Sequence, residues 1–171
     1  CWGQNALGQL GNGTAVPGQW PAGRPVAGIH RATAVTVGLD HSCALIDDGS
    51  LWCWGSNGGI CPRSLDCSDR TEGEDPTDRR ALCGQLGNGS TADSVVPVRV
   101  LLDEPVLSAD AGDLFTCAVG RSGRVYCWGC NFGGQVTGRD SIPSGYYPRP
   151  IPLRVPPYNP ALDQRFRGPG R

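Results

Sequence analysis

The sequence has no lysine, no methionine and no long apolar run. A helix needs about 18 consecutive apolar residues to cross a bilayer, so the sequence predicts no membrane-spanning helix. The 15 basic residues are all arginines, and 16 acidic residues balance them to give a net charge of −1. Because nucleic-acid-binding proteins usually carry a clearly basic face, this balance argues against a nucleic-acid partner.

The start of the chain lacks the features of a targeting segment. It opens with Cys1-Trp2-Gly3, and no charged segment leads into an apolar one. We expect the 171 residues to be part of a longer chain, because they begin inside a repeated unit. The 26 glycines follow no three-residue period, which excludes collagen. The hydrophobic fraction of 39%, with five tryptophans, predicts a folded core.

An internal repeat is the main feature of the sequence. The tripeptide Cys-Trp-Gly begins at Cys1, Cys53 and Cys127, and each copy is followed two residues later by an asparagine. A Gly-Gln-Leu-Gly-Asn-Gly element follows at 8–13 and 84–89, and it is degraded in the third copy. Without a large insertion at 58–82, the period is about 50–52 residues, which is the size of a four-stranded propeller blade.

Short alternating segments with Gly and Asp between them predict strands at 33–37, 41–46 and 50–54, and no segment has a convincing helical period. The sequence therefore predicts an all-β fold, a partial β-propeller with two complete four-stranded antiparallel blades and a partial third. A closed ring takes about four to eight blades, so we expect a longer chain to supply the remaining blades. The propeller is expected to span 1–155, with repeat units 1–52, 53–126 and 127–155, and the Pro- and Arg-rich residues 156–171 are expected to form a disordered tail.

Two pairs of cysteines are each ten residues apart. A hairpin that pairs residue 43 with residue 53 has a three-residue loop ending in Gly49, and the second copy has the same loop ending in Gly123. A type I turn followed by a left-handed glycine is a common three-residue hairpin connection. Directly opposed residues are close enough for a disulfide. The sequence predicts the disulfides Cys43–Cys53 and Cys117–Cys127; two facing buried thiols are the alternative.

The remaining cysteines are Cys61, Cys67, Cys83 and Cys130, near the insertion, and Cys1. Four cysteines allow three pairings, between which the sequence does not decide, and we favour Cys61–Cys67 and Cys83–Cys130. By the ten-residue rule, Cys1 is expected to pair with a cysteine upstream of this chain. Two cysteines on one hairpin do not complete a tetrahedral set of ligands, so we expect no metal. Paired cysteines predict an extracellular, periplasmic or cell-surface location.

These elements resemble the regulator of chromosome condensation repeat. The resemblance is carried by residues 38–45, Asp48-Gly49, 53–57 and 84–89, and it extends over about 1–155. It implies a propeller, commonly of seven blades, that serves as a binding platform, and the paired cysteines are similar to those of extracellular and bacterial versions. The resemblance implies structural roles within the repeat for Trp2, Gly3, Gln9, Gly38, His41, Gly49, Trp54, Gly55, Gln85, Gly112, Gly123, Trp128, Gly129 and Gln135.

Other candidate sites have a structural interpretation beside the functional one. His41 and Cys43 share a strand face, but a structural histidine between blades is favoured over a catalytic Cys–His pair. His30 is expected at the surface. Asn12 and Asn88 match the glycosylation pattern, although both lie in a turn of the repeat.

The sequence favours a non-enzymatic protein-binding or scaffold module without a cofactor. The expected contact surface comprises the insertion and the turns at 12–20 and 88–94, because binding residues concentrate on loops held by a rigid scaffold. Expected anchors are Trp20, Arg63 and Tyr146. Two alternatives stay open. A nucleotide-exchange or chromatin-associated regulator, like the founder of the family, predicts reduced cysteines and a basic face. A hydrolase predicts two carboxylates held at a fixed separation on strand ends.

Overall fold

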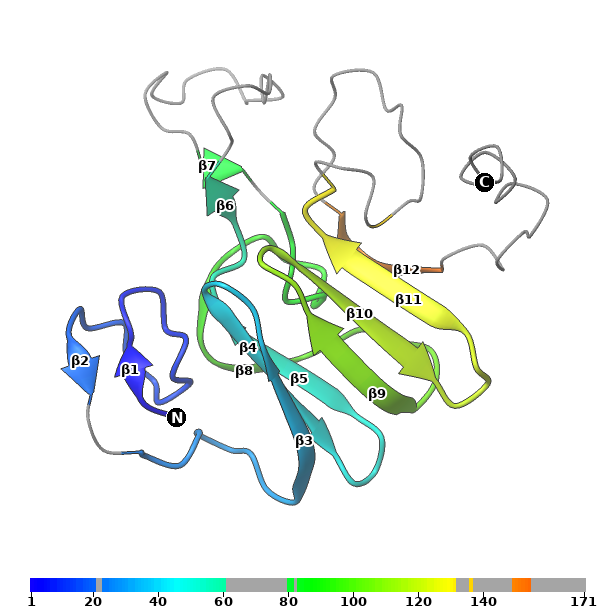
Figure 1. Ribbon diagram of the computed structural model, residues 1–171, viewed down its shortest axis with the longest axis horizontal. Coiled ribbons are helices and arrows are strands. Elements are labelled where there is room, and N and C mark those ends of the chain that lie inside the picture. Colours follow the sequence, from blue (N-terminus) through cyan, green and yellow to red (C-terminus); the bar gives the residue numbers. More distant parts are fainter. Residues whose placement is uncertain (21–22, 61–79, 82, 132–135, 137–148, 155–171) are drawn as a thin grey trace, which may run out of the picture.

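The computed structural model describes residues 1–20, 23–60, 80–81, 83–131, 136 and 149–154 (Figure 1). In these residues the regular structure consists of strands alone, as the sequence predicts. The first seven strands are β1 (Gly3–Gln4), β2 (Gln19–Trp20), β3 (Ala32–Val37), β4 (His41–Ile46), β5 (Leu51–Gly55), β6 (Gly59–Ile60) and β7 (Arg80–Ala81). The other five are β8 (Ser94–Arg99), β9 (Val106–Ala111), β10 (Phe115–Gly120), β11 (Val125–Gly129) and β12 (Arg149–Arg154).

Two four-stranded antiparallel sheets form the body of the molecule. The first has the order β3-β4-β5-β8 and the second has the order β9-β10-β11-β12, so neighbours in each sheet follow one another in the chain apart from the inserted β6 and β7. Figure 1 shows the two sheets next to each other, with the two-stranded β1–β2 sheet beside the first. Two four-stranded blades are present, as predicted, but the partial unit is the β1–β2 sheet at the start of the chain and not the predicted unit 127–155.

The sheets do not begin and end where the predicted repeat units do. The first sheet lies within 32–99 and the second within 106–154, so the boundary at residue 52 falls inside β5. Each Cys-Trp-Gly tripeptide forms or borders the third strand of a blade, and the Pro-containing run after it forms the fourth strand. A blade therefore takes its first two strands from the preceding sequence unit.

The two central hairpins have the predicted register. Residue 43 faces residue 53 and residue 117 faces residue 127, with Cα–Cα distances of 4.0 Å and 4.1 Å, and each pair is joined as a disulfide. The loop glycines have the left-handed conformation that the turn requires, with φ of 84° at Gly49 and 81° at Gly123.

The hydrophobic core lies between the two blades. It combines Leu45 and Leu51 of the first sheet with Ala118 and Trp128 of the second, and Leu86 from the loop before β8 fills the space between them. The faces of the two sheets that meet are therefore buried against each other. In the described residues no helix is long and apolar enough to cross a membrane.

The loop before β8 passes so close to the next blade that it needs glycine. Gly87 has φ of 65°, and a Cβ atom built there would lie 2.5 Å from Nε1 of Trp128. The upstream copy repeats the contact, because a Cβ atom at Gly11 would lie 2.8 Å from Nε1 of Trp54. At both junctions a tryptophan ring therefore packs directly against a glycine of the neighbouring loop.

We expect the substitution Gly87→Ala to lower the free energy of unfolding more than Gly123→Ala, by about 1–3 kcal/mol. Both positions have a positive φ and carry a similar backbone cost, but no described residue lies within 4 Å of a Cβ atom at Gly123. Denaturation by guanidinium chloride measures both variants against the parent chain. Equal losses would contradict the close approach of Trp128.

Several predicted residues lie outside the described residues. They are Cys61, Arg63, Cys67, Gln135 and Tyr146, and the proposed tail at 156–171.

Candidate functional site

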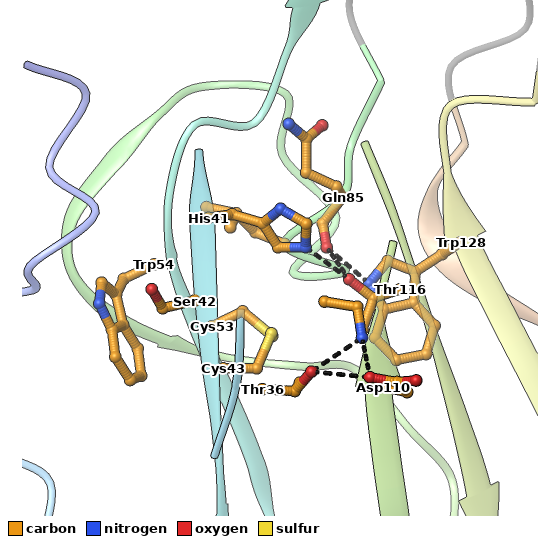
Figure 2. The surroundings of a disulfide bond; sticks show 12 residues. Thr36, His41, Ser42, Cys43, Cys53, Trp54, Gln85, Asp110, Thr116 and Trp128 are labelled. Carbon is orange, nitrogen blue, oxygen red and sulfur yellow. Dashed lines mark hydrogen bonds between the residues drawn. A yellow bond between two sulfur atoms is a disulfide. The ribbon is translucent and has the colours of Figure 1, made fainter. Parts of the chain in front are cut away.

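The two blades are joined through the main-chain carbonyl of Gln85. Its oxygen accepts hydrogen bonds from Thr116 Oγ1 at 3.0 Å and from Trp128 Nε1 at 2.9 Å. The Thr116 hydroxyl also contacts Nε2 of His41 at 2.9 Å. Figure 2 shows this chain of bonds running from β4 of the first blade to the second blade, with the Cys43–Cys53 disulfide beside it.

The hydrogen bonds determine which nitrogen of His41 carries the proton. A threonine hydroxyl has one hydrogen, and Thr116 donates it to Gln85, so Nε2 of His41 must be the donor to Thr116. The other nitrogen, Nδ1, is buried and has no hydrogen-bond partner among the described residues. A second proton would therefore create a buried N–H group with no acceptor.

Burial consequently lowers the pKa of His41 from 6.5 to about 4. The imidazole lies against Gly38, where a Cβ atom would come within 2.5 Å of Nδ1. His41 is 1% exposed, and the adjacent Cys43 sulfur is bonded to Cys53. The pair thus has neither a free thiolate nor access to solvent, and His41 acts as a neutral hydrogen-bond donor between blades.

The upstream junction repeats this pattern. The main-chain oxygen of Gln9 accepts hydrogen bonds from Ser42 Oγ at 3.1 Å and from Trp54 Nε1 at 2.9 Å. Ser42 and Trp54 lie on the side of the first sheet opposite to His41 (Figure 2). A glutamine carbonyl that receives one hydroxyl and one indole is therefore the common element of both junctions.

The second blade departs from the pattern at Phe115, which occupies the position of His41. Its ring lies against Gly112, as the imidazole of His41 lies against Gly38. A phenyl ring has no donor to offer a neighbouring hydroxyl, so this blade cannot provide the bond that His41 provides.

His41 is expected to make the stability of the protein fall in acid. Above pH 6.5 the histidine is neutral in both states, and its contribution to stability is complete. As the pH falls from 6.5 to about 4, His41 becomes protonated in the unfolded chain but stays neutral in the folded chain. The free energy of unfolding therefore falls by about 3 kcal/mol over this range.

Urea denaturation at a series of pH values between 4 and 7.5 measures this loss. The control is His41→Phe, which copies Phe115 and does not titrate. The difference between the two stability curves isolates His41 from the carboxyl groups. Parallel curves would show that the imidazole is not buried in its neutral form.

The insertion leaves the first blade from a fixed base. Its backbone starts and ends in the antiparallel pair β6–β7, where Gly59 faces Ala81. Close to Gly59, the Cys83–Cys130 disulfide joins the segment after β7 to the residue after β11, with a Cα–Cα distance of 4.5 Å. The Gln85 side chain donates to the Gly58 carbonyl at 2.8 Å. This base is therefore bonded to both blades.

Buried asparagines organise the loops, and they were not among the predicted site residues. Asn57 is fully buried, accepts a hydrogen bond from Leu86 N at 2.9 Å and donates to Ser90 O and Ala92 O at 2.7 and 3.1 Å. In the other copies the asparagine acceptor receives the N–H of Leu10 and of Val136. Their recurrence after Cys-Trp-Gly is the sequence signal for this role.

We expect Asn57→Ala to destabilise the chain by about 3 kcal/mol or more, because it leaves one buried N–H and two carbonyl groups without their partner. The matched control is Asn88→Ala, since Asn88 accepts from Ser90 N in its own turn at 3.1 Å. Thermal and urea denaturation compare the two variants. A loss in Asn57→Ala no larger than that of Asn88→Ala would contradict this role.

The other predicted residues lie apart from this junction. Trp20 is in β2, opposite Gly3, and His30 is exposed. The Asn12 side chain accepts from the N–H and the hydroxyl of Thr14, as expected for an asparagine in a turn. In the described residues, no group of three or more His, Cys, Asp or Glu side chains is arranged to hold a metal ion.

Comparisons with known proteins identify the repeat. Residues 32–58 and 106–135 match the family profile of the Regulator of chromosome condensation (RCC1) repeat. The two matches begin at the first strand of each blade and extend past the third. The chain belongs to the RCC1 repeat family.

Two curated relatives match most of this chain. The ultraviolet-B receptor of Arabidopsis thaliana is 31% identical over 159 residues, which cover 75% of this chain and 36% of the receptor. A probable E3 ubiquitin-protein ligase of Homo sapiens is 32% identical over 171 residues, which cover 79% of this chain and 16% of the ligase. The chain thus spans well under half the length of either relative.

Solved structures show the same fold. The crystal structure of human WBSCR16 has a TM-score of 0.60 at 18% identity and covers 89% of this chain and 33% of that one. Yeast RCC1 (Prp20), solved with Kap60, has a TM-score of 0.52 at 21% identity and covers 94% of this chain and 33% of that one. The fold is that of an RCC1-type β-propeller, of which this chain forms part.

Proposed function

We propose that the chain is a non-enzymatic protein-binding module of a disulfide-stabilised β-propeller. The observation that carries the proposal is the fixed base of the insertion. Strands β6 and β7 stand on a disulfide that joins the two blades, and the Gln85 side chain bonds to Gly58 directly beneath them. Because this base is already fixed, little conformational entropy of the scaffold is lost when a partner binds to the insertion. A smaller entropy loss favours higher affinity.

Contacts near the two predicted turns support a common surface. Gly13 N donates to Val95 O at 3.0 Å, which joins the loop after β1 to the start of β8. The second turn, at 88–94, leads into that strand and is tied to Asn57 at the start of the insertion. The proposed contact surface is therefore the insertion 58–83 with the turns at 12–20 and 88–94.

Three residues are proposed as anchors on this surface: Trp20, Arg63 and Tyr146. Aromatic and arginine side chains contribute most to protein interfaces, because they bury a large area and also offer hydrogen bonds. The relatives give the proposal its background, since yeast RCC1 was crystallised with a bound protein, Kap60.

We also propose that the protein resides in an oxidising compartment, which is extracellular, periplasmic or at the cell surface. Three pairs of cysteines lie within disulfide distance, and two of the pairs span hairpins at equivalent positions in the two blades. Such pairs persist where thiols are not kept reduced.

Replacing residues 61–79 with a Gly-Ser linker is expected to abolish partner binding while the blades stay folded. Immobilised parent and variant chains are exposed to the same secreted and surface proteins, and the captured proteins are quantified by mass spectrometry. The captured amount of each protein that binds the parent is expected to be at least tenfold lower with the variant, because the linker removes the insertion and its anchor Arg63.

The matched control keeps the insertion and changes exposed residues at the opposite end of the first blade. Asp47→Ser with Arg31→Ser removes an exposed ion pair at the β4–β5 turn, and it is expected to capture the same proteins as the parent. Unchanged capture by the linker variant, or equal loss in the control, would contradict the proposed surface.

A further inference from the structure

Three asparagines of the sequence are followed directly by glycine, and such an asparagine is chemically labile. The pairs are Asn12-Gly13, Asn57-Gly58 and Asn88-Gly89. Asparagine is a thermolabile residue, because the next main-chain nitrogen can attack the amide carbon Cγ of its side chain. A glycine at the next position has no Cβ atom to hinder this attack. Differences between the three pairs must therefore come from their surroundings in the folded chain.

The pair Asn57-Gly58 is protected by burial. Both residues are buried, and the Asn57 side chain is held by three main-chain groups. Its oxygen accepts from Leu86 N at 2.9 Å, and its nitrogen donates to Ser90 O and Ala92 O at 2.7 and 3.1 Å. These bonds must break before Cγ can turn toward the next nitrogen, and water has no access to the pair.

The pair Asn12-Gly13 reaches the surface, but the attacking nitrogen is engaged. Gly13 N donates to Val95 O at 3.0 Å. The nitrogen must give its proton to water or hydroxide before it can attack, and the Val95 carbonyl occupies the place of that base. The Asn12 oxygen also accepts from Asn5 Nδ2 at 3.3 Å and from Thr14 N and Oγ1 at 3.1 and 2.8 Å. These bonds hold the side chain in one orientation.

The pair Asn88-Gly89 has neither form of protection in the part of the chain that the structure describes. Gly89 is exposed and Asn88 is half-buried. No described carbonyl accepts a hydrogen bond from Gly89 N. The Asn88 side chain has one hydrogen bond among the described residues, in which its oxygen accepts from Ser90 N at 3.1 Å. The nitrogen can therefore lose its proton to solvent, and one bond alone opposes rotation of the side chain.

We infer that Asn88-Gly89 is a site of spontaneous deamidation in the folded protein, whereas Asn12-Gly13 and Asn57-Gly58 are preserved. The inference rests on the exposure and the hydrogen bonds of the three pairs. It is independent of the proposed partner-binding function.

The reaction consumes one water molecule and releases one ammonia molecule. Gly89 N gives up its proton and attacks Cγ of Asn88, so that the N–Cγ bond forms, the Cγ–Nδ2 bond breaks and the amide nitrogen leaves with that proton as ammonia. Water then opens the resulting succinimide ring. Cleavage at Cγ gives aspartate, and cleavage at the main-chain carbonyl of residue 88 gives isoaspartate. No group is oxidised or reduced.

The isoaspartate product lengthens the main chain between two fixed points. On one side Gly87 lies against the indole of Trp128, and on the other side Ser90 O accepts from Asn57 Nδ2 at 2.7 Å. An isoaspartate carries the main chain through its side-chain carbons, which places one extra carbon between these points. The isoaspartate form is therefore expected to unfold at a lower urea concentration than the unmodified chain.

Incubation of the folded 171-residue chain at neutral pH, followed by peptide mapping at intervals, measures the reaction at each pair. Chromatography and mass spectrometry separate the asparagine, aspartate and isoaspartate forms. Deamidation of Asn88 is expected to be at least tenfold faster than that of Asn57. It is expected to be about 2- to 12-fold faster than that of Asn12, as for one neutral hydrogen bond at the nitrogen.

The matched control is the same chain, reduced and unfolded in urea. All three asparagines precede glycine, so their rates are expected to become similar once the fold is lost. In the folded chain, equal rates at Asn12 and Asn88, or a rate at Asn57 as high as that at Asn88, would overturn the inference. So would the same ranking in the unfolded chain, because the sequence and not the fold would then determine the rates.

Two variants separate the consequences of the modification. Asn88→Gln is expected to keep its urea midpoint during incubation, because its longer side chain does not form the five-membered ring. Asn88→Asp carries the charge of the product without the extra carbon, and it is expected to unfold close to the parent. If the urea midpoint of Asn88→Gln falls during incubation as much as that of the parent, the loss arises elsewhere and the inference fails.

Discussion

The carbonyl oxygen of Gln85 is the acceptor on which the arrangement of the two blades depends. It belongs to the loop before β8 of the first blade, and it receives the hydroxyl of Thr116 and the indole of Trp128 from the second blade. Both donors are fully buried, so water cannot replace the acceptor. The loop can reach this position only because Gly87 allows the indole to lie on its backbone. This interaction therefore explains why Gly and Trp recur together, whereas the Gln85 side chain has a separate role as a donor to Gly58 O.

The same junction explains why a histidine is present without titrating near neutral pH. His41 extends the bond network from Thr116 into the first blade, and in the part of the chain that the structure describes its second nitrogen has no partner. Burial makes a charged imidazole costly there, and it lowers the pKa of His41 to about 4. The second blade has Phe115 at this position, so successive junctions differ in polarity although their backbones match.

Much of the fold could be predicted from the sequence because it is encoded locally. The turn glycines Gly49 and Gly123 fix the hairpin loops, and the ten-residue cysteine spacing independently gives the same register. The strand at which each blade begins was harder to predict. Nothing in a repeating pattern marks where a unit starts, and the chosen boundary at residue 52 falls inside β5.

The residues of the junction were only partly predictable. His41 was expected between blades, but its acceptor Thr116 lies 75 positions away and carries no recognisable motif of its own. Ser42 and Asn57 were overlooked for a similar reason, since each side chain bonds to backbone atoms about 30 positions distant. Their only signal was recurrence at one place in each copy. The anchors Arg63 and Tyr146 lie outside the described residues and stay a proposal.

The Cys83–Cys130 bond holds the Gln85 loop against the end of β11, so the cysteine pairing reports directly on the junction. Non-reducing peptide mapping of the folded chain, with free thiols blocked before digestion, is the most direct measurement. The account predicts linked peptides for Cys43–Cys53, Cys83–Cys130 and Cys117–Cys127, and a blocked thiol at Cys1. A map that joins Cys83 to a cysteine other than Cys130, or that finds the ten-residue pairs unlinked, would contradict it.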